Sequence, residues 1–285
     1  MAEPDFQGLS VLALESRRAD EIARLIEHYG GRAVVAPALR ELPLGNAEEI
    51  AGFLRALAAG NYDLLVLMTG VGLRILVEAA QASLSAAEIQ AALRRARLLA
   101  RGPKPVSELR RLGLDADLLA PEPNTWREIL AALEAAYPQG LAGLSLAVLE
   151  YGLPGQLQRE LESRGARVRT LRVYRYALPE DTAPLRAAIA AALAGRLDVM
   201  LLTSSQQAEH LLHVAAEMGV AEALRRALQR MALASIGPDT SLSLRALGLH
   251  PDLEPAHPHM GFLVREAAGR APALLRQKRA SPSPA

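Results

Sequence analysis

The octapeptide GLSVLALE at residues 8–15 returns as GLSLAVLE at residues 143–150. The same shift of 135 positions, without any gap, pairs Asp63 with Asp198, and each of these residues precedes an apolar run. Other landmarks in the same register are Gly30 and Gly165, Arg40 and Arg175, Gly102-Pro103 and Gly237-Pro238, and Asp117-Leu118 and Asp252-Leu253. Chance similarity between helices rich in Ala and Leu does not hold one register over more than a hundred positions. We therefore interpret the chain as a tandem duplication.

The two octapeptides belong to a wider pattern in which short apolar runs alternate with helical patterns. Such runs occupy residues 9–14, 33–36, 64–68 and 98–100, and they are separated by stretches of helical periodicity. Strands that read as continuous apolar runs are buried on both faces, which indicates parallel sheets flanked by helices. The sequence therefore predicts an α/β fold of two doubly wound parallel-sheet lobes. Breaks rich in Pro and polar residues at 37–46, 121–125 and 179–184 are candidate linkers.

The composition narrows the possible function classes. The chain has 285 residues, 51% of them hydrophobic, and no cysteine. It is long enough for about two domains, and disulfides, thiolate nucleophiles and cysteine-ligated metals are excluded. A net charge of +1 and only 4% aromatic residues do not favour nucleic acid as a partner. No apolar run approaches the ~20 residues that span a membrane, and residues 1–5 lack the pattern of a signal peptide, so we expect a cytoplasmic protein.

The strand-to-helix turns are the candidate binding sites, because ligands of open α/β sheets lie beyond the carboxyl ends of the strands. The duplication supplies these turns in matching pairs. They are Thr69-Gly70-Val71-Gly72 with Thr203-Ser204-Ser205, and Arg101-Gly102-Pro103-Lys104 with Gly237-Pro238-Asp239-Thr240. Glycine allows a ligand to approach the backbone, and amides at a helix N-terminus favour negative charge. For any single turn, however, an ordinary helix cap explains the same residues.

Other chemistries find less support in the sequence. Gly70-Val71-Gly72 is a weak dinucleotide fingerprint because Ile75 stands where a third glycine belongs, and no Walker A pattern surrounds Lys104. His210 and His213 are one helical turn apart, but the other copy has no ligand pair at the matching positions, so we expect surface histidines and no metal site. No GxSxG elbow is present, and Ser204 and Ser205 are interpreted as anion-binding hydroxyls rather than nucleophiles.

Tyr174 and Tyr176 follow a strand of the second copy and precede a Pro-rich break. If Val173 faces a core, alternation along a strand directs both tyrosines to the opposite side, towards a space between the lobes. Packing against the linker is an equally good interpretation of the two rings.

Taken together, these motifs resemble the uroporphyrinogen-III synthase family over roughly residues 8–268. Their order and spacing carry the resemblance. The matching features are Thr69-Gly70-Val71-Gly72 after Asp63 and its apolar run, Ala100-Arg101-Gly102 with Lys104, Val173-Tyr174 before a basic residue, Leu202-Thr203-Ser204-Ser205, and Ser235-Ile236-Gly237-Pro238-Asp239-Thr240 with Leu247-Gly248-Leu249 downstream. Two positions depart from the family pattern. Ser16-Arg17-Arg18 stands where many members have Thr-Arg-Pro, and Asp239 stands where a neutral residue is more usual.

The resemblance implies how the chain is divided. Residues 1–38 and 177–270 would form one discontinuous lobe, residues 43–172 would form the other, and a two-stranded linker would join them around an active-site cleft. Residues 271–285 are expected to form a disordered tail, since the final stretch is polar and has nothing to bury.

The resemblance also implies a lyase of tetrapyrrole, porphyrin and haem biosynthesis that acts as a monomer. Its substrate would be hydroxymethylbilane, a linear tetrapyrrole with eight carboxylates, which is closed with loss of water and inversion of ring D. No cofactor and no metal are implied. Tyr174 would be catalytic, assisting departure of the hydroxyl. The implied substrate-binding residues are Thr69, Gly70, Val71, Gly72, Arg101, Gly102, Lys104, Thr203, Ser204, Ser205, Gly237, Pro238 and Thr240.

Two other classes of function stay open on the sequence. A two-lobed binding or sensor protein for a small polyanionic ligand would share the fold and the turns but would release its ligand unchanged. A sugar-phosphate or nucleotide enzyme is the third interpretation, and the missing phosphate fingerprint counts against it.

Overall fold

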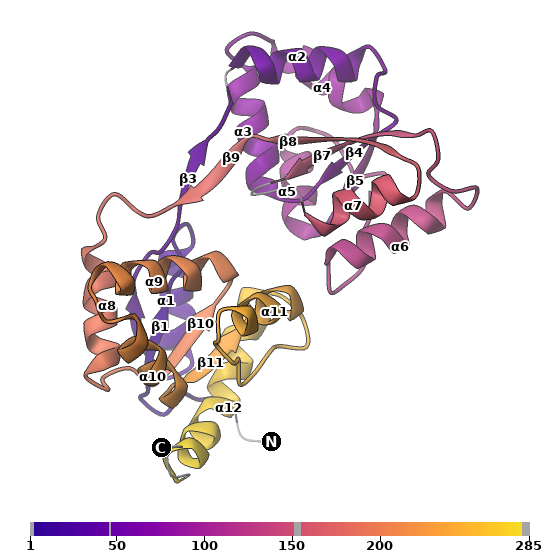
Figure 1. Cartoon of the computed structure of the whole chain (residues 1–285). Coiled ribbons are helices and arrows are strands. Elements are labelled where there is room, and N and C mark those ends of the chain that lie inside the picture. Colours follow the sequence, from indigo (N-terminus) through magenta and orange to yellow (C-terminus); the bar gives the residue numbers. More distant parts are fainter. Residues whose placement is uncertain (1–2, 46, 151–154, 281–285) are drawn as a thin grey trace. The chain divides into compact units, whose positions relative to one another are not determined.

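The computed structural model describes residues 3–45, 47–150 and 155–280 (Figure 1). Its contacts divide the chain into two units. Unit 1 comprises Met1–Arg40 and Tyr176–Ala285, and unit 2 comprises Glu41–Arg175. Unit 1 is thus discontinuous in sequence and unit 2 continuous.

Unit 1 contains a four-stranded parallel sheet in the order β11-β10-β1-β2. In Figure 1, helices α8, α9 and α10 are grouped beside β1 and β10. The elements of this unit are β1 (Ser10–Ala13), α1 (Ala19–His28), β2 (Arg32–Val35), α8 (Ala183–Leu193), β10 (Val199–Leu202), α9 (Ser205–Glu217), α10 (Ala221–Arg230), β11 (Ala232–Ser235), α11 (Pro238–Ala246) and α12 (Met260–Ala280).

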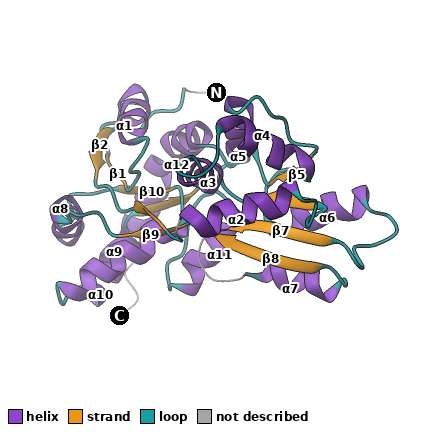
Figure 2. Ribbon diagram, turned by 90° about the horizontal axis from the view of Figure 1, so that it is seen from above, coloured by secondary structure: helices purple, strands orange, loops and turns teal. Residues whose placement is uncertain are grey.

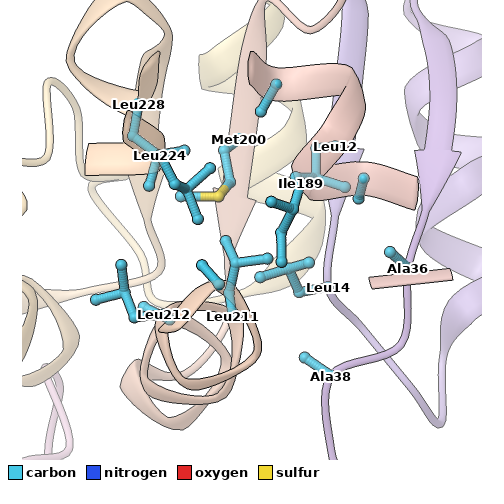
Figure 3. Close-up of a cluster of buried hydrophobic side chains, with 14 of the residues drawn as sticks. Leu12, Leu14, Ala36, Ala38, Ile189, Met200, Leu211, Leu212, Leu224 and Leu228 are labelled. Atoms are coloured by element: carbon cyan, nitrogen blue, oxygen red, sulfur yellow. The ribbon is translucent and has the colours of Figure 1, made fainter. Parts of the chain in front are cut away.

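Strands β1, β10 and β11 of unit 1 are buried on both faces because alternate side chains enter two separate cores. Leu12 and Leu14 join a cluster with helices α8 to α11, and Figure 3 shows Leu14 near Leu211 and Met200 near Leu224. Val11 and Ala13 point the other way, into a cluster with α1 and α12. This two-sided burial explains why β1 reads as a continuous apolar run rather than an alternating one.

Unit 2 contains a five-stranded parallel sheet in the order β6-β5-β4-β7-β8. Figure 2 shows β7 and β8 side by side. The elements are α2 (Ala47–Ala58), β4 (Leu64–Leu67), α3 (Gly70–Ala80), α4 (Ala86–Arg95), β5 (Arg97–Ala100), α5 (Pro103–Arg111), β6 (Leu118–Leu119), α6 (Trp126–Ala136), β7 (Ser145–Glu150), α7 (Gln156–Ser163) and β8 (Arg167–Arg172).

One face of this second sheet packs on helices α6 and α7. Leu64 and Val66 from β4 and Val148 from β7 share a core with Leu133 and Leu161 of those helices. The intervening residues of β4, Leu65 and Leu67, are also fully buried. Both sheets therefore follow the doubly wound pattern that the sequence predicts.

The chain passes between the units at β3 (Arg40–Pro43) and β9 (Tyr174–Ala177), which pair as a two-stranded sheet. Beyond β3, the N–H of Leu44 donates to the carbonyl of Val173 at 2.7 Å. The predicted α/β class with two parallel-sheet lobes is confirmed, and β3 with β9 supplies the two-stranded linker.

The predicted disordered tail from residue 271 is wrong for residues 271–280. Helix α12 runs to Ala280, and its Ala271, Pro272 and Leu275 are buried in unit 1. Of these residues, Ala271 and Leu275 pack in the hydrophobic core of unit 1. The prediction went wrong because it relied on the polar composition of the final stretch. The rest of the predicted tail, residues 281–285, lies outside the described residues. Within the described part of the chain, no helix combines the length and apolarity needed to cross a membrane.

Candidate functional site

The carboxyl edge of the unit 2 sheet brings together four predicted or newly identified positions. Strands β5, β4, β7 and β8 are parallel, so their last residues lie along one edge. That edge carries the Arg101 turn after β5, the Thr69 turn after β4, Glu150 at the end of β7 and Arg172 at the end of β8.

The Thr69 turn combines a helix cap with close backbone packing. The hydroxyl of Thr69 accepts the N–H of Gly72 at 3.0 Å and so caps α3. A Cβ on Gly70 would lie 2.7 Å from the carbonyl oxygen of Lys104, which places the two predicted turns of this unit in contact. Gly70 is therefore required by close approach, because a side chain there meets backbone rather than a movable group.

Tyr174 is fully buried, and its hydroxyl lies 3.1 Å from Thr69 Oγ1. Val173 is also fully buried, so the two neighbours do not divide between a core and an open side as alternation predicts. The linker hydrogen bond at Val173 and the pairing of β9 with β3 hold this segment against unit 2. The ring is thus buried, while the hydroxyl contacts the first residue of a predicted turn.

The second turn of unit 2 presents cationic groups and a helix N-terminus. Gly102 is the N-cap of α5 and Pro103 begins the helix, where the missing N–H of proline costs nothing. Arg101 is half-buried and Lys104 is exposed. A positive N-terminus flanked by these two side chains suits a carboxylate ligand.

Glu150 is a site residue that the sequence interpretation did not single out. Burial raises the pKa of its carboxyl group above the ordinary value, and the nearby Arg101 and Arg172 guanidinium groups and the N–H of Gly155 offset only part of that shift. Oε2 of this carboxyl is buried without a hydrogen-bond partner among the described residues. Gly155 is the N-cap of α7, and a Cβ there would lie 3.2 Å from Glu150 Oε1.

The corresponding edge of unit 1 is built around Thr203. Its hydroxyl donates to Glu15 Oε2 at 2.6 Å and accepts from Gln207 Nε2 at 2.8 Å. Its N–H donates to Gln207 Oε1 at 2.9 Å, and Gln207 is almost fully buried. Ser204 caps α9 by accepting the N–H of Gln206, and Ser205 is the first residue of that helix. Thr203 is thus held by its neighbours, and Ser204 and Ser205 stand at the helix N-terminus.

The Gly237–Thr240 turn begins α11, with Gly237 as N-cap and Pro238 as first residue. Beneath it, the buried hydroxyls of Ser235 and Ser241 hydrogen-bond each other, and Ser241 donates to Glu254. Asp239 is exposed in the first turn of the helix, where a negative charge is favourable to the helix dipole.

The structure gathers the predicted residues into two sets, one at the carboxyl edge of each sheet. The same two edges also hold four residues that the sequence interpretation did not single out, namely Glu15, Glu150, Arg172 and Gln207. The repeat contained the available signal, since Glu15 and Glu150 are the matched last residues of the two octapeptides.

The other candidates lie apart from these sets. His210 Nδ1 lies 2.7 Å from the carbonyl oxygen of Ala38, and His213 approaches Glu217. Among residues 3–45, 47–150 and 155–280, no group of three or more His, Cys, Asp or Glu side chains could hold a metal ion. A pocket of about 180 Å³ lies at the opposite, amino edge of the unit 2 sheet, lined by Asn61, Tyr62, Ser145, Arg167, Val168 and Arg169.

Comparison with known proteins identifies the sequence family. The family described as uroporphyrinogen-III synthase HemD matches residues 20–265. The chain is 28% identical over 255 residues to the uncharacterized protein YjjA of Bacillus subtilis (strain 168), covering 89% of this chain and 92% of that protein. It is 31% identical over 239 residues to a Methanothermobacter thermautotrophicus (strain Delta H) protein named "Putative uroporphyrinogen-III synthase", covering 81% and 87% of the two chains.

A solved structure agrees with this result. A mutant uroporphyrinogen III synthase from the extremely thermophilic bacterium Thermus thermophilus superposes with a TM-score of 0.66 at 29% identity, covering 94% of this chain and 100% of that one.

Proposed function

Since the chain belongs to the uroporphyrinogen-III synthase family, we propose that it cyclises hydroxymethylbilane to uroporphyrinogen III. In this reaction water leaves from the hydroxymethyl carbon of the linear tetrapyrrole, giving an azafulvene. The ring at the far end attacks to form a spiro intermediate, which fragments and recloses with ring D inverted. The proposed enzyme is a lyase that eliminates water, and no electron is gained or lost.

The arrangement of the turns supports recognition of a substrate with eight carboxylates. Helices α3, α5, α9 and α11 each begin at the carboxyl end of a parallel strand, within the four predicted turns. The backbone N–H groups of the first helical turn and the positive end of the helix dipole favour a carboxylate at each of these positions. We propose that Thr69–Gly72, Arg101–Lys104, Thr203–Ser205 and Gly237–Thr240 bind the substrate carboxylates.

The contact between Tyr174 and Thr69 is the observation that carries the catalytic part of the proposal. It brings a phenol, which is protonated at neutral pH, to the turn that begins α3. We propose that the Tyr174 hydroxyl donates a hydrogen bond to the departing substrate hydroxyl. This role requires it to exchange its bond with Thr69 for one with the substrate, since the ring is buried.

Restraint of the substrate is the second contribution. Hydroxymethylbilane also closes without inversion, so the protein has to hold the chain ends in the geometry that leads to the spiro centre. Positioning of this kind can contribute on the order of 7–11 kcal/mol in favourable cases. The backbone amides, hydroxyls and two cationic side chains of the four turns are groups suited to holding carboxylates.

Turnover by a small amount of protein distinguishes this proposal from a binding or sensor protein. Purified protein is mixed with a large excess of freshly generated hydroxymethylbilane, and consumption of the bilane is followed against a protein-free sample. We expect many molecules of bilane consumed per molecule of protein, well above the spontaneous rate. Consumption at the spontaneous rate, with the bilane bound and released unchanged, would instead indicate a binding protein.

A further inference from the structure

Glu150 places a carboxyl group where the proposed function calls for positive charge. It ends β7 at the edge that also carries Arg101 and Arg172, and the N–H of Gly155 at the start of α7 binds it. Its Oε2 atom is buried and lacks a hydrogen-bond partner among the described residues. An ionised carboxylate with one oxygen left unsolvated is costly, so this environment favours the neutral form more than water does.

The charges of two arginines favour the ionised form of that carboxyl group and so oppose the effect of burial. Arg101 directly follows β5 and Arg172 ends β8, and the charges of both act on this carboxyl group, as does the N–H of Gly155 at the N-terminus of α7. These are the groups whose charges oppose the effect of burial on the pKa of Glu150. In its ionised form Glu150 partly neutralises the arginines, and it repels any other carboxylate that approaches them.

We propose that Glu150 is a further binding-site residue, which takes up a proton when ligand carboxylates bind Arg101 and Arg172. The proposal rests on the proposed function, which supplies the polycarboxylate ligand and assigns Arg101 to its binding. The new element is an exchange of charge. Glu150 loses its negative charge as the ligand supplies its own, so that the arginines interact with Glu150 or with the ligand, but not with both.

The sign of the effect follows from linkage. Ligand carboxylates that pair with the two arginines reduce their attraction for the Glu150 charge, so the pKa of Glu150 rises further in the complex. A group whose pKa rises on binding takes up protons from solution, and the affinity then increases as the pH falls between its free and bound pKa values. Glu150→Gln mimics the neutral state, and it should bind the ligand more tightly than the wild-type protein does near neutral pH.

Calorimetric titration with uroporphyrinogen III, kept under nitrogen, tests the proposal. Wild type, Glu150→Gln and the control Glu162→Gln are each titrated in two buffers of different ionisation enthalpy, which reports the protons taken up. Glu162 lies near the other end of α7, is exposed, and accepts from Gln158 at 2.8 Å. We expect proton uptake in the wild type and in Glu162→Gln, little or none in Glu150→Gln, and an affinity gain of about 3- to 10-fold for Glu150→Gln alone.

A second variant keeps the test independent of how well Glu150→Gln folds. In Arg172→Met the carboxyl group has lost one of its opposing charges before ligand arrives, so proton uptake on binding should shrink while affinity falls. Unchanged proton uptake in both variants, with binding intact, would overturn the role of Glu150 and leave the proposed function standing. A wild-type protein that neither binds uroporphyrinogen III nor consumes hydroxymethylbilane would overturn the proposed function and, with it, the inference about Glu150.

Discussion

Single side chains at the carboxyl edge of unit 2 have separable structural and chemical effects. The Tyr174 ring is buried, whereas its hydroxyl bonds Thr69, which in turn accepts the N–H of Gly72. Removing only the hydroxyl leaves both the ring and the helix cap in place. This residue therefore allows the packing interpretation and the catalytic interpretation to be distinguished.

Tyr174→Phe should slow formation of uroporphyrinogen III on the order of 10²-fold if the hydroxyl assists the leaving group. The loss of one hydrogen bond should lower the free energy of unfolding by about 0.5–1.5 kcal/mol, and product affinity should change little. Steady-state rates, urea unfolding and product titration measure the three quantities. Turnover close to that of the wild type would show that the ring matters only for packing.

Gly70→Ala should lower the free energy of unfolding by about 1–3 kcal/mol, because the added Cβ meets the backbone of Lys104. The matched control is Gly52→Ala in the exposed part of α2, where a Cβ meets nothing within 4 Å. In a helix interior this control should raise stability by about 0.4–1 kcal/mol. Equal urea midpoints for the two variants would contradict the close approach of the two turns.

The residues that cap or shape a turn could be predicted from the sequence, whereas for Glu150 the repeat marked only the position and not its environment. Thr69, Gly70, Ser204 and Gly237 are identifiable because local rules link each residue type to a helix start. The environment of Glu150 depends on Arg101 and Arg172, which only the pairing of separate strands brings near. No local pattern around residue 150 contains that information.

At the scale of elements, helix α12 shows how composition can mislead. Near its C-terminal end, Lys278 Nζ donates to the carbonyls of Gln229 at 3.2 Å and Met231 at 2.7 Å, and to Asp252 Oδ2 at 2.6 Å. Arg279 donates to Asp198 Oδ1 at 2.6 Å. The two charged side chains at the end of the helix thus bind acceptors near β10 and β11 of unit 1. These acceptors are remote from the helix end in sequence.

Lys278→Met should lower the free energy of unfolding by about 1–3 kcal/mol, since three acceptors lose a donor that is mostly shielded from water. Arg276→Met, at an exposed position of the same helix, serves as the control and should stay within about 0.5 kcal/mol of the wild type. Urea unfolding of both variants provides the comparison. If the two variants are equally stable, the end of α12 does not hold unit 1 together.

At the scale of the whole molecule, the duplication extends to individual hydrogen bonds. Asp198 Oδ2 accepts the N–H of Ser10 at 2.9 Å, and Asp63 Oδ2 accepts that of Ser145 at 2.8 Å. Arg32 and Arg167 donate to the hydroxyls of the same two serines. Each of these pairs is related by the shift of 135 positions seen in the sequence. The two sheets therefore share the same hydrogen bonds at their amino edges, in addition to equivalent strands.

The discontinuity of unit 1 could not be worked out from the repeat alone. The two copies meet near the second octapeptide, whereas the units are divided at Arg40/Glu41 and Arg175/Tyr176. As a result β1 of the first copy pairs with β10 of the second, and β2 and β11 lie at the two edges of the same sheet. The repeat shows which strands of the two copies are equivalent. It does not show whether a strand pairs within its own copy or with the other copy, and only the family resemblance predicted that arrangement.

Residues 41–175 contain a complete five-stranded sheet with its own core, so we expect this fragment to fold by itself. Its far-ultraviolet circular dichroism should show helix and strand, and urea should unfold it in one cooperative transition. A gradual, non-cooperative loss of signal would mean that unit 2 depends on unit 1 for its stability.

The central claim is that this protein directs hydroxymethylbilane to the inverted macrocycle, and the isomer ratio of the product measures it most directly. Hydroxymethylbilane is generated fresh, incubated with increasing amounts of the purified protein, oxidised to the porphyrins and resolved by chromatography. The account predicts that type I uroporphyrin, from spontaneous closure, is replaced by type III as the protein concentration rises. A product that remains type I at every protein concentration would contradict the account.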